Sequence, residues 1–358
     1  QAFSTANSKE NGPRRGCPTP HNMAPHCSMQ QALRMLVAAF IIRVRSSPTC
    51  PGELQVPGLG SVRPSVTQVN TPGDRGKLAG LVEVGGDTLT PHMRGRAYFS
   101  DTCTDNAFTN TQYMSLNLLG KTLRYTVDVS GAGCGCNAAM YLVSMPQNTQ
   151  AGTCGDDYYC DANSVCGVAC AEIDIQEANM YAWHSTLHSS TDRSGIGSGS
   201  GGGGNGWSGP RDWDLQDYGP GGRCIDTTEA FDVAVSFPED SEGKAWGMEV
   251  ELTQSWKECS LKSTVSGYKD MPQLNDALSL GMTPVFSYWS NKNMLWMDGK
   301  GSDGSGPCAV DEPKACAEAV KFSNFRVFRM DDEDPGPSQT KPSARTSATP
   351  PAMPQKRP

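Results

Sequence analysis

Hydrophobic and polar residues alternate through the middle of the chain with the period of a half-buried β-strand. In residues 122–129 every second side chain is apolar, which would place the apolar residues on one face of a strand. Similar runs, rich in β-branched and aromatic residues, recur at 140–145, 230–237, 247–253, 284–289 and 320–330. Only residues 272–280 have clear helical spacing, with Gly281 as a stop. Many strands and little helix predict an all-β sandwich or barrel.

The pattern divides the 358 residues into three parts. Residues 1–84 are rich in proline, serine, glycine and basic residues, and we expect a disordered or leader-like region. Within it, residues 29–45 contain an apolar run that suits either a signal-peptide core or a short amphipathic helix. Residues 85–330 carry the strand pattern and form the predicted folded domain. Residues 331–358 open with an acidic run and continue as a Pro/Ser/Thr-rich tail, also predicted to be disordered.

Composition and charge narrow the class of protein. A hydrophobic content of 37% supports one core, while 39 glycines and 25 prolines indicate many loops. The net charge of −8 argues against nucleic acid as a partner, because neutralising phosphates needs a basic surface. No stretch reaches the ~20 apolar residues of a membrane helix, so no membrane partner is expected. Fourteen cysteines favour an oxidising compartment and therefore a secreted, extracellular or cell-wall location.

The densest acidic motif is Glu172-Ile-Asp-Ile-Gln-Glu177. On an ideal strand Glu172 and Asp174 share one face while Glu177 points away, so the three meet only if a bulge near residues 175–176 shifts the register. Neighbouring carboxylates then push their pKa values apart, leaving an ionised nucleophile and a protonated acid, the pair that a glycosidase uses. The alternative is a solvated acidic strand edge.

Ordered sequence blocks around this motif strengthen the first interpretation. They lie at residues 118–130, 134–145, 159–163, 170–179, 218–221, 225–228, 281–282 and 293–298. In that order they resemble glycoside hydrolase family 7, the cellobiohydrolases and endoglucanases of cellulose breakdown. The resemblance covers roughly residues 85–330. It implies a concanavalin-A-like β-jelly-roll sandwich with a concave substrate cleft, retaining hydrolysis of β-1,4-glucan, and no cofactor.

The resemblance also implies roles for individual residues. Glu172 would be the nucleophile, Glu177 the general acid/base, and Asp174 the carboxylate that hydrogen-bonds the nucleophile. His188 would lie near the leaving-group side of the cleavage point; the alternative is a surface polar residue. His184 and His188 are four residues apart, but no glutamate or third ligand accompanies them, so we predict no metal site.

Five further residues are candidates for substrate binding. A glucan cleft needs aromatic platforms, because sugar rings present flat CH faces. Trp289 and Trp296 match the two family tryptophans that flank the cleavage point, with core packing as the alternative. Arg211 has the spacing of a product-side arginine, with an ordinary surface arginine as the alternative. Tyr141 and Asp161 match cleft-lining positions.

Departures from the family limit the comparison. Gln176 replaces the tryptophan usual in the catalytic motif, which should cost packing but no proton-transfer group. The family's first strands have no recognisable counterpart in residues 1–84, so one or two strands are either missing or unrecognised. Short loops tilt the expectation towards an open cleft and internal cutting, although Arg211 favours exo action.

The cysteines give a further test. By resemblance, Cys134 would bridge to Cys308 and Cys160 to Cys170. A second family bridge loses a member at Ala169, with Cys166 as a possible substitute.

The sequence therefore predicts a monomeric, retaining glycoside hydrolase that cleaves β-1,4-glucosidic bonds in cellulose or a related β-glucan polysaccharide. Two alternatives stay open. A β-1,3- or mixed-linkage glucanase would use a similar carboxylate strand, and a non-catalytic glucan-binding cell-wall protein would keep the cleft without turnover.

Overall fold

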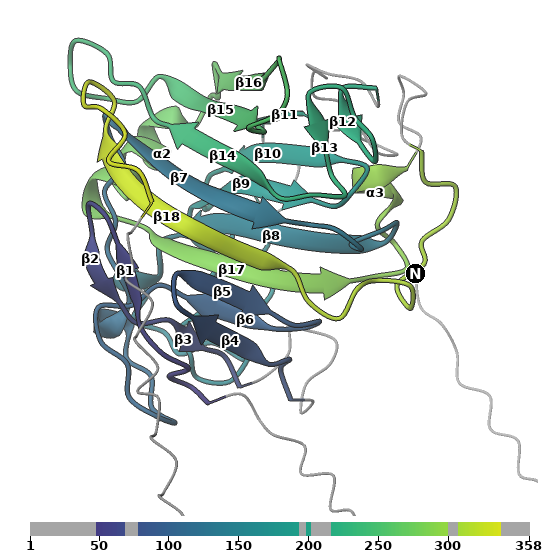
Figure 1. Ribbon diagram of the computed structural model, residues 1–358. Helices are drawn as coiled ribbons and strands as arrows, with labels where there is room; N and C mark the ends of the chain where they lie inside the picture. The colour runs from purple at the N-terminus through teal and green to yellow at the C-terminus, as the bar shows by residue number, and fades with distance from the viewer. Residues whose placement is uncertain (1–47, 69–77, 193–197, 202–215, 300–306, 338–358) are drawn as a thin grey trace, which may run out of the picture. The chain divides into compact units, whose positions relative to one another are not determined.

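Two antiparallel sheets of seven strands each form the fold. The computed structural model describes residues 48–68, 78–192, 198–201, 216–299 and 307–337, all within one compact unit. The first sheet has the order β11-β10-β9-β8-β17-β6-β3, with bounds Ser198–Gly201, Trp183–His188, Glu172–Ala178, Cys136–Val143, Thr283–Ser290, Arg96–Tyr98 and Ser65–Val66. The second has the order β16-β15-β14-β7-β18-β5-β4, with bounds Leu261–Ser266, Gly247–Thr253, Phe231–Ser236, Lys121–Asp128, Lys321–Arg329, Thr88–Pro91 and Val82–Gly85. In Figure 1, β7 and β18 lie over β8 and β17.

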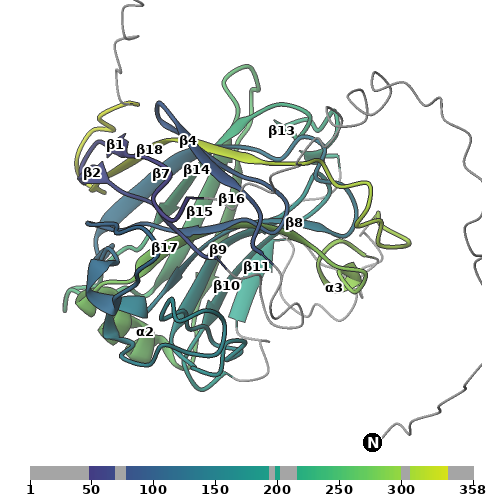
Figure 2. The same cartoon turned by 90° about the horizontal axis from the view of Figure 1, so that it is seen from below.

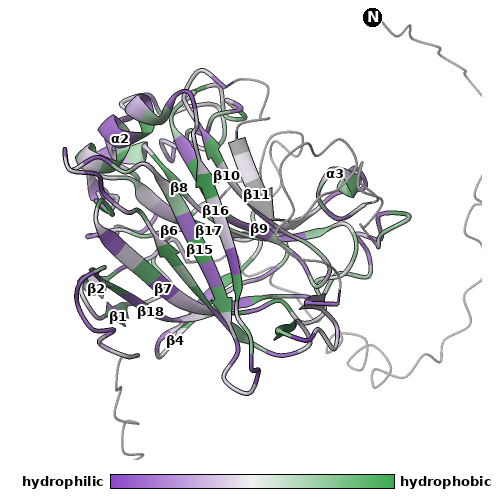
Figure 3. Ribbon diagram, turned by 90° about the horizontal axis from the view of Figure 1, so that it is seen from above, coloured by the Kyte–Doolittle hydropathy of each residue, from purple (hydrophilic) through white to green (hydrophobic). Residues whose placement is uncertain are grey.

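The core lies between the two sheets. On β7 the predicted apolar face, Leu123, Tyr125 and Val127, is fully buried, while the residues between them are half-buried. The bands of hydrophobic and hydrophilic residues along the strands can be followed in Figure 3. From the first sheet, Trp183 and Phe286 enter the same core cluster. The sandwich predicted from the alternation is therefore confirmed, and it is the fold of a β-jelly roll.

Shorter elements complete the described part of the chain. They are β1 (Leu54–Val56), β2 (Gly60–Val62), β12 (Tyr218–Gly219), β13 (Ile225–Asp226), α2 (Met271–Leu280), α3 (Leu295–Asp298) and the 3-10 turns η1 (Asn110–Gln112) and η2 (Met145–Gln147). Figure 2 shows α2 and α3 at opposite ends of the sheets. Helix α2 confirms the predicted helix and ends at Gly281, whose φ of 89° disfavours any larger residue. No helix in the described ranges is both long and apolar enough to span a bilayer.

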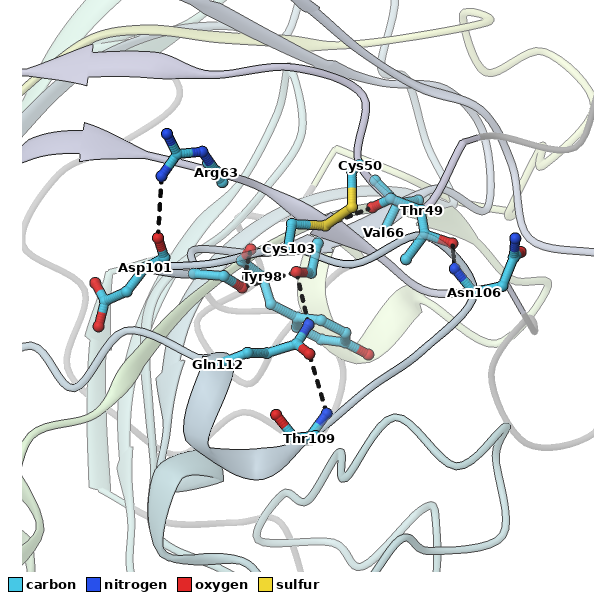
Figure 4. Close-up of a disulfide and its surroundings, with 12 residues drawn as sticks. Thr49, Cys50, Arg63, Val66, Tyr98, Asp101, Cys103, Asn106, Thr109 and Gln112 are labelled. Atoms are coloured by element: carbon cyan, nitrogen blue, oxygen red, sulfur yellow. Dashed lines mark hydrogen bonds between the residues drawn. A yellow bond between two sulfur atoms is a disulfide. The ribbon is translucent and has the colours of Figure 1, made fainter.

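The predicted start of the folded domain at residue 85 is wrong. Strands β1, β2, β3 and most of β4 precede it, and β3 pairs with β6 in the first sheet. Ser65 of β3 accepts hydrogen bonds from the Ser100 hydroxyl and the Gln112 amide, both at 2.9 Å. The Cys50–Cys103 disulfide attaches this segment to the sandwich (Figure 4). Strands of two or three residues carry no measurable periodicity, so these strands were present but unrecognisable in the sequence.

The folded part also continues past the predicted boundary at residue 330. Asp334, placed in the tail by its sequence, forms an ion pair with the buried Arg326 of β18. A second ion pair joins Asp334 to Arg124 of β7, with Nη1 and Oδ2 3.1 Å apart. Two charges on the outer face of the second sheet therefore hold residues 331–337 against it.

Twelve cysteines lie in the described ranges, and they form six disulfides. Both pairings expected from the resemblance, Cys134–Cys308 and Cys160–Cys170, are present. Cys166 pairs with Cys154, so it does take part in a bridge near the lost position at Ala169. The others are Cys50–Cys103, Cys136–Cys316 and Cys224–Cys259.

Candidate active site

A β-bulge lies in the middle of β9, where the acidic motif required one. Opposite β8, Gln176 pairs with Met140, but Asp174 pairs with the next residue, Tyr141, so Ile175 is the extra residue. The pairing of β9 with β10 shifts at the same place. The predicted bulge near residues 175–176 is confirmed.

The bulge sends two consecutive side chains into the core. Ile175 and Gln176 are both fully buried, and Ile175 belongs to the core cluster between the sheets. Gln176 accepts a hydrogen bond from the hydroxyl of Tyr125 on the opposite sheet (3.0 Å) and donates one to the Ala138 carbonyl (2.9 Å). The glutamine that replaces a tryptophan of the family therefore binds across the sandwich, and the next residue, Glu177, returns to the same face as Asp174.

We call this surface of the first sheet, turned away from the core, the site face. Register alone places residues on it, because directly paired residues of neighbouring strands point to the same side. Glu172, Asp174 and Glu177 pair with His188, Thr186 and His184 of β10, in that order. On the other side they pair with Val143, Tyr141 and Ala139 of β8. The three carboxylates thus form one row between two strands.

Glu172 is held by the backbone of the loop between β8 and β9. Its Oε2 accepts a hydrogen bond from the amide N–H of Ala162 at 3.0 Å, and the side chain is buried. Burial raises the pKa of Glu172 well above its usual value, and the negative charges of Asp174 and Asp161 add to the effect. An amide donor aimed at one oxygen favours the ionised form and leaves the other oxygen for chemistry.

Glu177 is a second carboxyl group whose pKa lies far above that of a free glutamate. Asn137 of β8 donates a hydrogen bond from Nδ2 to Oε1 of Glu177 at 2.9 Å. Burial and the charge of Asp174 raise the pKa of Glu177 to about 8, against the opposing influence of Asn137. A protonated carboxyl beside buried carboxylates is what general acid catalysis requires.

His188 lies between two carboxylates. Its Nε2 is 3.1 Å from Oδ2 of Asp174, and its Nδ1 is 2.8 Å from Oδ2 of Asp192. Burial alone would lower the pKa of His188, but the hydrogen bond and charge of Asp174 outweigh it and raise the pKa to about 10. The ion pair of Asp174 is therefore with the imidazolium, whereas the sequence led us to expect its hydrogen bond on the nucleophile.

Tyr141 and Asp161 lie close to the carboxylates of β9. The hydroxyl groups of Tyr141 and Tyr159 are 2.9 Å apart, and both rings are buried. Asp161 accepts a hydrogen bond from the amide of Val165 at 2.9 Å. Burial nevertheless raises the pKa of Asp161. Both residues are buried, Tyr141 on β8 and Asp161 within the loop that joins β8 to β9.

Arg96 is a site-face residue that the sequence analysis missed. It lies on β6 with 3% exposure, its guanidinium 4.0 Å above the ring of Tyr159. Its Nε donates to the Tyr98 hydroxyl, which in turn donates to Asp157. A buried cation at this position offsets the excess of carboxylates. The only signal for Arg96 in the sequence was a charged residue within a short strand. Asn137, which the sequence analysis also missed, was likewise marked only by being a polar residue within the apolar strand β8.

The two tryptophans occupy different positions. Trp289 of β17 pairs in register with Asn137, so it lies on the site face, where it packs half-buried against Met294 and Met297. Trp296 of α3 is 36% exposed and meets the ring of His184 edge-on, with centroids 5.8 Å apart. Trp289 is therefore partly packed on the site face, and Trp296 is an exposed aromatic side chain. Arg211 lies outside the described residues.

A β-sandwich that presents two glutamates and an aspartate on one face of a strand offers the pair of carboxyl groups that glycoside hydrolysis uses. The comparisons with known proteins agree. The sequence model of glycosyl hydrolase family 7 matches residues 105–166. Residues 105–166 of this chain are therefore similar to that family.

Curated relatives carry endoglucanase names. Endoglucanase EG-1 of Hypocrea jecorina is 32% identical over 240 residues, which is 56% of this chain and 49% of that protein. The probable endo-beta-1,4-glucanase celB of Aspergillus fumigatus is 27% identical over 258 residues, covering 60% of this chain and 63% of that protein. The chain thus spans about half the length of the first of these relatives.

Solved structures show the same fold. Endoglucanase I complexed with cellobiose aligns with a TM-score of 0.56 and 18% identity, over 79% of this chain and 98% of the other. A family 7 cellobiohydrolase from Daphnia pulex aligns with a TM-score of 0.57 and 18% identity, over 80% and 98%. The fold class predicted from the sequence is confirmed by both.

Proposed function

We propose that the protein is a retaining glycoside hydrolase that cleaves β-1,4-glucosidic bonds in cellulose or a related β-glucan. The observation that carries this proposal is the bulge in β9, which brings Glu172, Asp174 and Glu177 to one face. A solvated acidic strand edge would need no bulge, no burial and no dedicated hydrogen-bond partners. Here each of the three carboxyl groups has a dedicated partner: Ala162 for Glu172, His188 for Asp174 and Asn137 for Glu177.

The roles follow from the partners. Glu172, with one oxygen held by the Ala162 amide, attacks the anomeric carbon, while Glu177 donates its proton to the leaving glycosidic oxygen. Glu177 then takes a proton from water, whose oxygen attacks the same carbon and releases Glu172. Both glutamates return to their starting state. Asp174, paired with His188, holds negative charge beside them and so keeps the proton on Glu177.

The substrate is proposed from the relatives and the site face together. The related structures include complexes whose titles name cellobiose and cellotetraose. Trp289 and Trp296 would supply the aromatic platforms for glucose rings, and His188, Tyr141 and Asp161 would border the cleavage point. Arg211 stays a candidate for the product side. We propose further that the protein acts as a secreted monomer, in keeping with its six disulfides in the described ranges.

The alternatives predict different substrates. A β-1,3- or mixed-linkage glucanase could use the same carboxylates, but the relatives' printed names favour β-1,4 bonds and endo action. A non-catalytic glucan-binding protein would have no use for buried carboxyl groups whose pKa values are raised far above those of free glutamates. Neither alternative has an observation of its own in its favour.

The test is hydrolysis of cellohexaose, with laminarin and lichenan as the comparison substrates. We expect cellohexaose to be cleaved with the β-anomer formed first, as seen by proton NMR. Glu172→Gln and Glu177→Gln should each lose more than ~99% of the activity, while Glu258→Gln, the same change at an exposed site, should keep it. Cleavage of laminarin alone would support the second glucanase class. Binding to cellulose without any turnover by the unmodified protein would refute the enzymatic proposal.

A further inference from the structure

The turn after β10 brings an acidic residue back onto the site. Asp192 donates its backbone N–H to the Ser189 carbonyl at 3.0 Å, which closes a turn of four residues directly after His188. This turn returns the carboxylate of Asp192 to the imidazole, where Oδ2 and Nδ1 are 2.8 Å apart. His188 and Asp192 are only four residues apart in the sequence, yet their contact lies beside the carboxylates of β9.

Hydrogen bonds to the neighbouring segment hold the turn in place. The Ser189 amide donates to the hydroxyl of Tyr268 at 2.8 Å, and the Ser189 hydroxyl donates to Asp270 at 3.0 Å. The Ser190 amide donates to the side chain of Gln273 on α2. A turn attached at three points places its carboxylate reproducibly, so the contact with His188 is a built feature rather than a chance encounter of surface side chains.

The geometry at His188 requires both ring nitrogens to donate. Each nitrogen faces an oxygen of a carboxylate, and an ionised carboxylate can only accept. The side chains of His188, Asp174 and Asp192 are 7%, 10% and 13% exposed, so little water is available to replace either partner. An imidazole with a single proton would leave one of these pairs without a hydrogen.

We propose that Asp192 is a positioning residue that keeps His188 doubly protonated and turned towards Asp174. This deepens the proposed function and rests on it for its catalytic meaning. The groups facing His188 are Glu172, Asp174 and Glu177 of β9 and Asp192 of its own turn, whereas Asp270 before α2 is bonded to Ser189 instead. The imidazolium of His188 thus faces these carboxyl groups, and Asp192 holds it at Nδ1 while Nε2 faces Asp174.

The consequence for catalysis concerns the ionisation of the nucleophile. The positive charge of His188 lowers the pKa of Glu172 and of Glu177, against the larger effect of burial. Without Asp192, the imidazole loses one charged acceptor and gives up its second proton more readily. The site would then lose the cation that favours ionised Glu172 at a lower alkaline pH, and the alkaline limb of the rate profile would move to lower pH.

The decisive experiment follows the imidazole itself. The protein labelled with ¹⁵N-histidine is titrated by NMR, and the His188 ring signals are assigned by their loss in His188→Gln. In Asp192→Asn we expect His188 to titrate about one to two pH units lower than in the unmodified protein. Asp192→Glu, which keeps the charge, should restore most of the shift. Asp276→Asn, the same change at an exposed position of α2, is the matched control.

The second measurement is the pH dependence of kcat/KM on a soluble cello-oligosaccharide. The alkaline limb should move to lower pH in Asp192→Asn, return in Asp192→Glu and stay unchanged in Asp276→Asn, with KM little affected in all three. A His188 titration that is the same in Asp192→Asn and the unmodified protein overturns the proposal. If the unmodified protein hydrolyses no glucan, the function proposed above fails, while the NMR titration still decides whether Asp192 holds His188. Should Asp192→Asn not fold, the ¹⁵N signals of His188 in the unmodified protein supply the test: both ring nitrogens should carry a proton at pH 8, and a ring with a single proton at that pH overturns the proposal.

Discussion

Replacing Glu177 with glutamine is expected to stabilise the folded protein, and to do so more at pH 7 than at pH 5. The pKa of Glu177 is about 8 in the fold, compared with 4.5 for an unperturbed glutamate. Because the folded state binds this proton more tightly than the unfolded chain, the contribution of Glu177 to stability is largest below pH 4.5. This contribution is lost progressively as the pH rises from 4.5 towards 8.

The magnitude follows from the size of the shift. Each pH unit between the two pKa values costs about 1.4 kcal/mol, so the protonated Glu177 costs at most about 3 kcal/mol at pH 7 and about 1 kcal/mol at pH 5. Glutamine has the size of the protonated acid, and its oxygen can still accept the hydrogen bond from Asn137. It has no charge to gain on unfolding. Partial solvent exposure of Glu177 reduces the effect, and we expect a difference of about 2 kcal/mol between the two pH values.

Urea unfolding at pH 5 and pH 7 measures this difference directly. The three proteins to compare are the unmodified chain, Glu177→Gln and the control Glu258→Gln, which removes an exposed carboxyl. The reasoning would be refuted if Glu177→Gln changed the free energy of unfolding equally at both pH values. It would also be refuted if the control showed the same pH-dependent gain.

Three further predictions concern the site and its supports. The kcat/KM of the unmodified protein should fall above pH ~8, where Glu177 loses its proton, and a profile that stays flat to pH 10 would contradict the assigned acid. Gln176→Leu leaves the buried Tyr125 hydroxyl without its acceptor and should cost about 1–3 kcal/mol in urea unfolding, part of which Tyr125→Phe should recover in the double variant. Lack of any recovery would mean that the bond across the sandwich contributes nothing. Asp334→Ala should cost about 2 kcal/mol, because it leaves the buried Arg326 with one charged partner fewer. An unchanged thermal unfolding temperature would show that the chain beyond residue 330 is dispensable.

Much of the fold could be predicted from the sequence because its signals are local. The alternation in residues 122–129 appears as the buried face of β7, and the helical spacing of residues 272–280 appears as α2. The spacing of the carboxylate motif also predicted a local feature of the backbone. Glu177 could join Glu172 and Asp174 only through a bulge, and the structure has that bulge at Ile175. Periodicity and spacing are properties of neighbouring residues, so they survive without knowledge of the fold.

Other features required the tertiary structure. Strands β1, β2 and β3 exist because longer strands and a disulfide lie beside them, and two or three residues carry no pattern of their own. The hydrogen bond from Asn137 to Glu177 and the stacking of Arg96 on Tyr159 join residues that are 40 and 63 positions apart, from different strands and loops.

The charge state of the site also required the tertiary structure. The sequence by itself determined which residues could act as acid and nucleophile, since it supplied the carboxylates and their spacing. Only the packing of the two sheets and of the loop over β8 decided how deeply each carboxyl is buried and which donor it meets. Those two quantities set the pKa values, because desolvation and hydrogen bonding depend on every group around an atom and not on its neighbours along the chain.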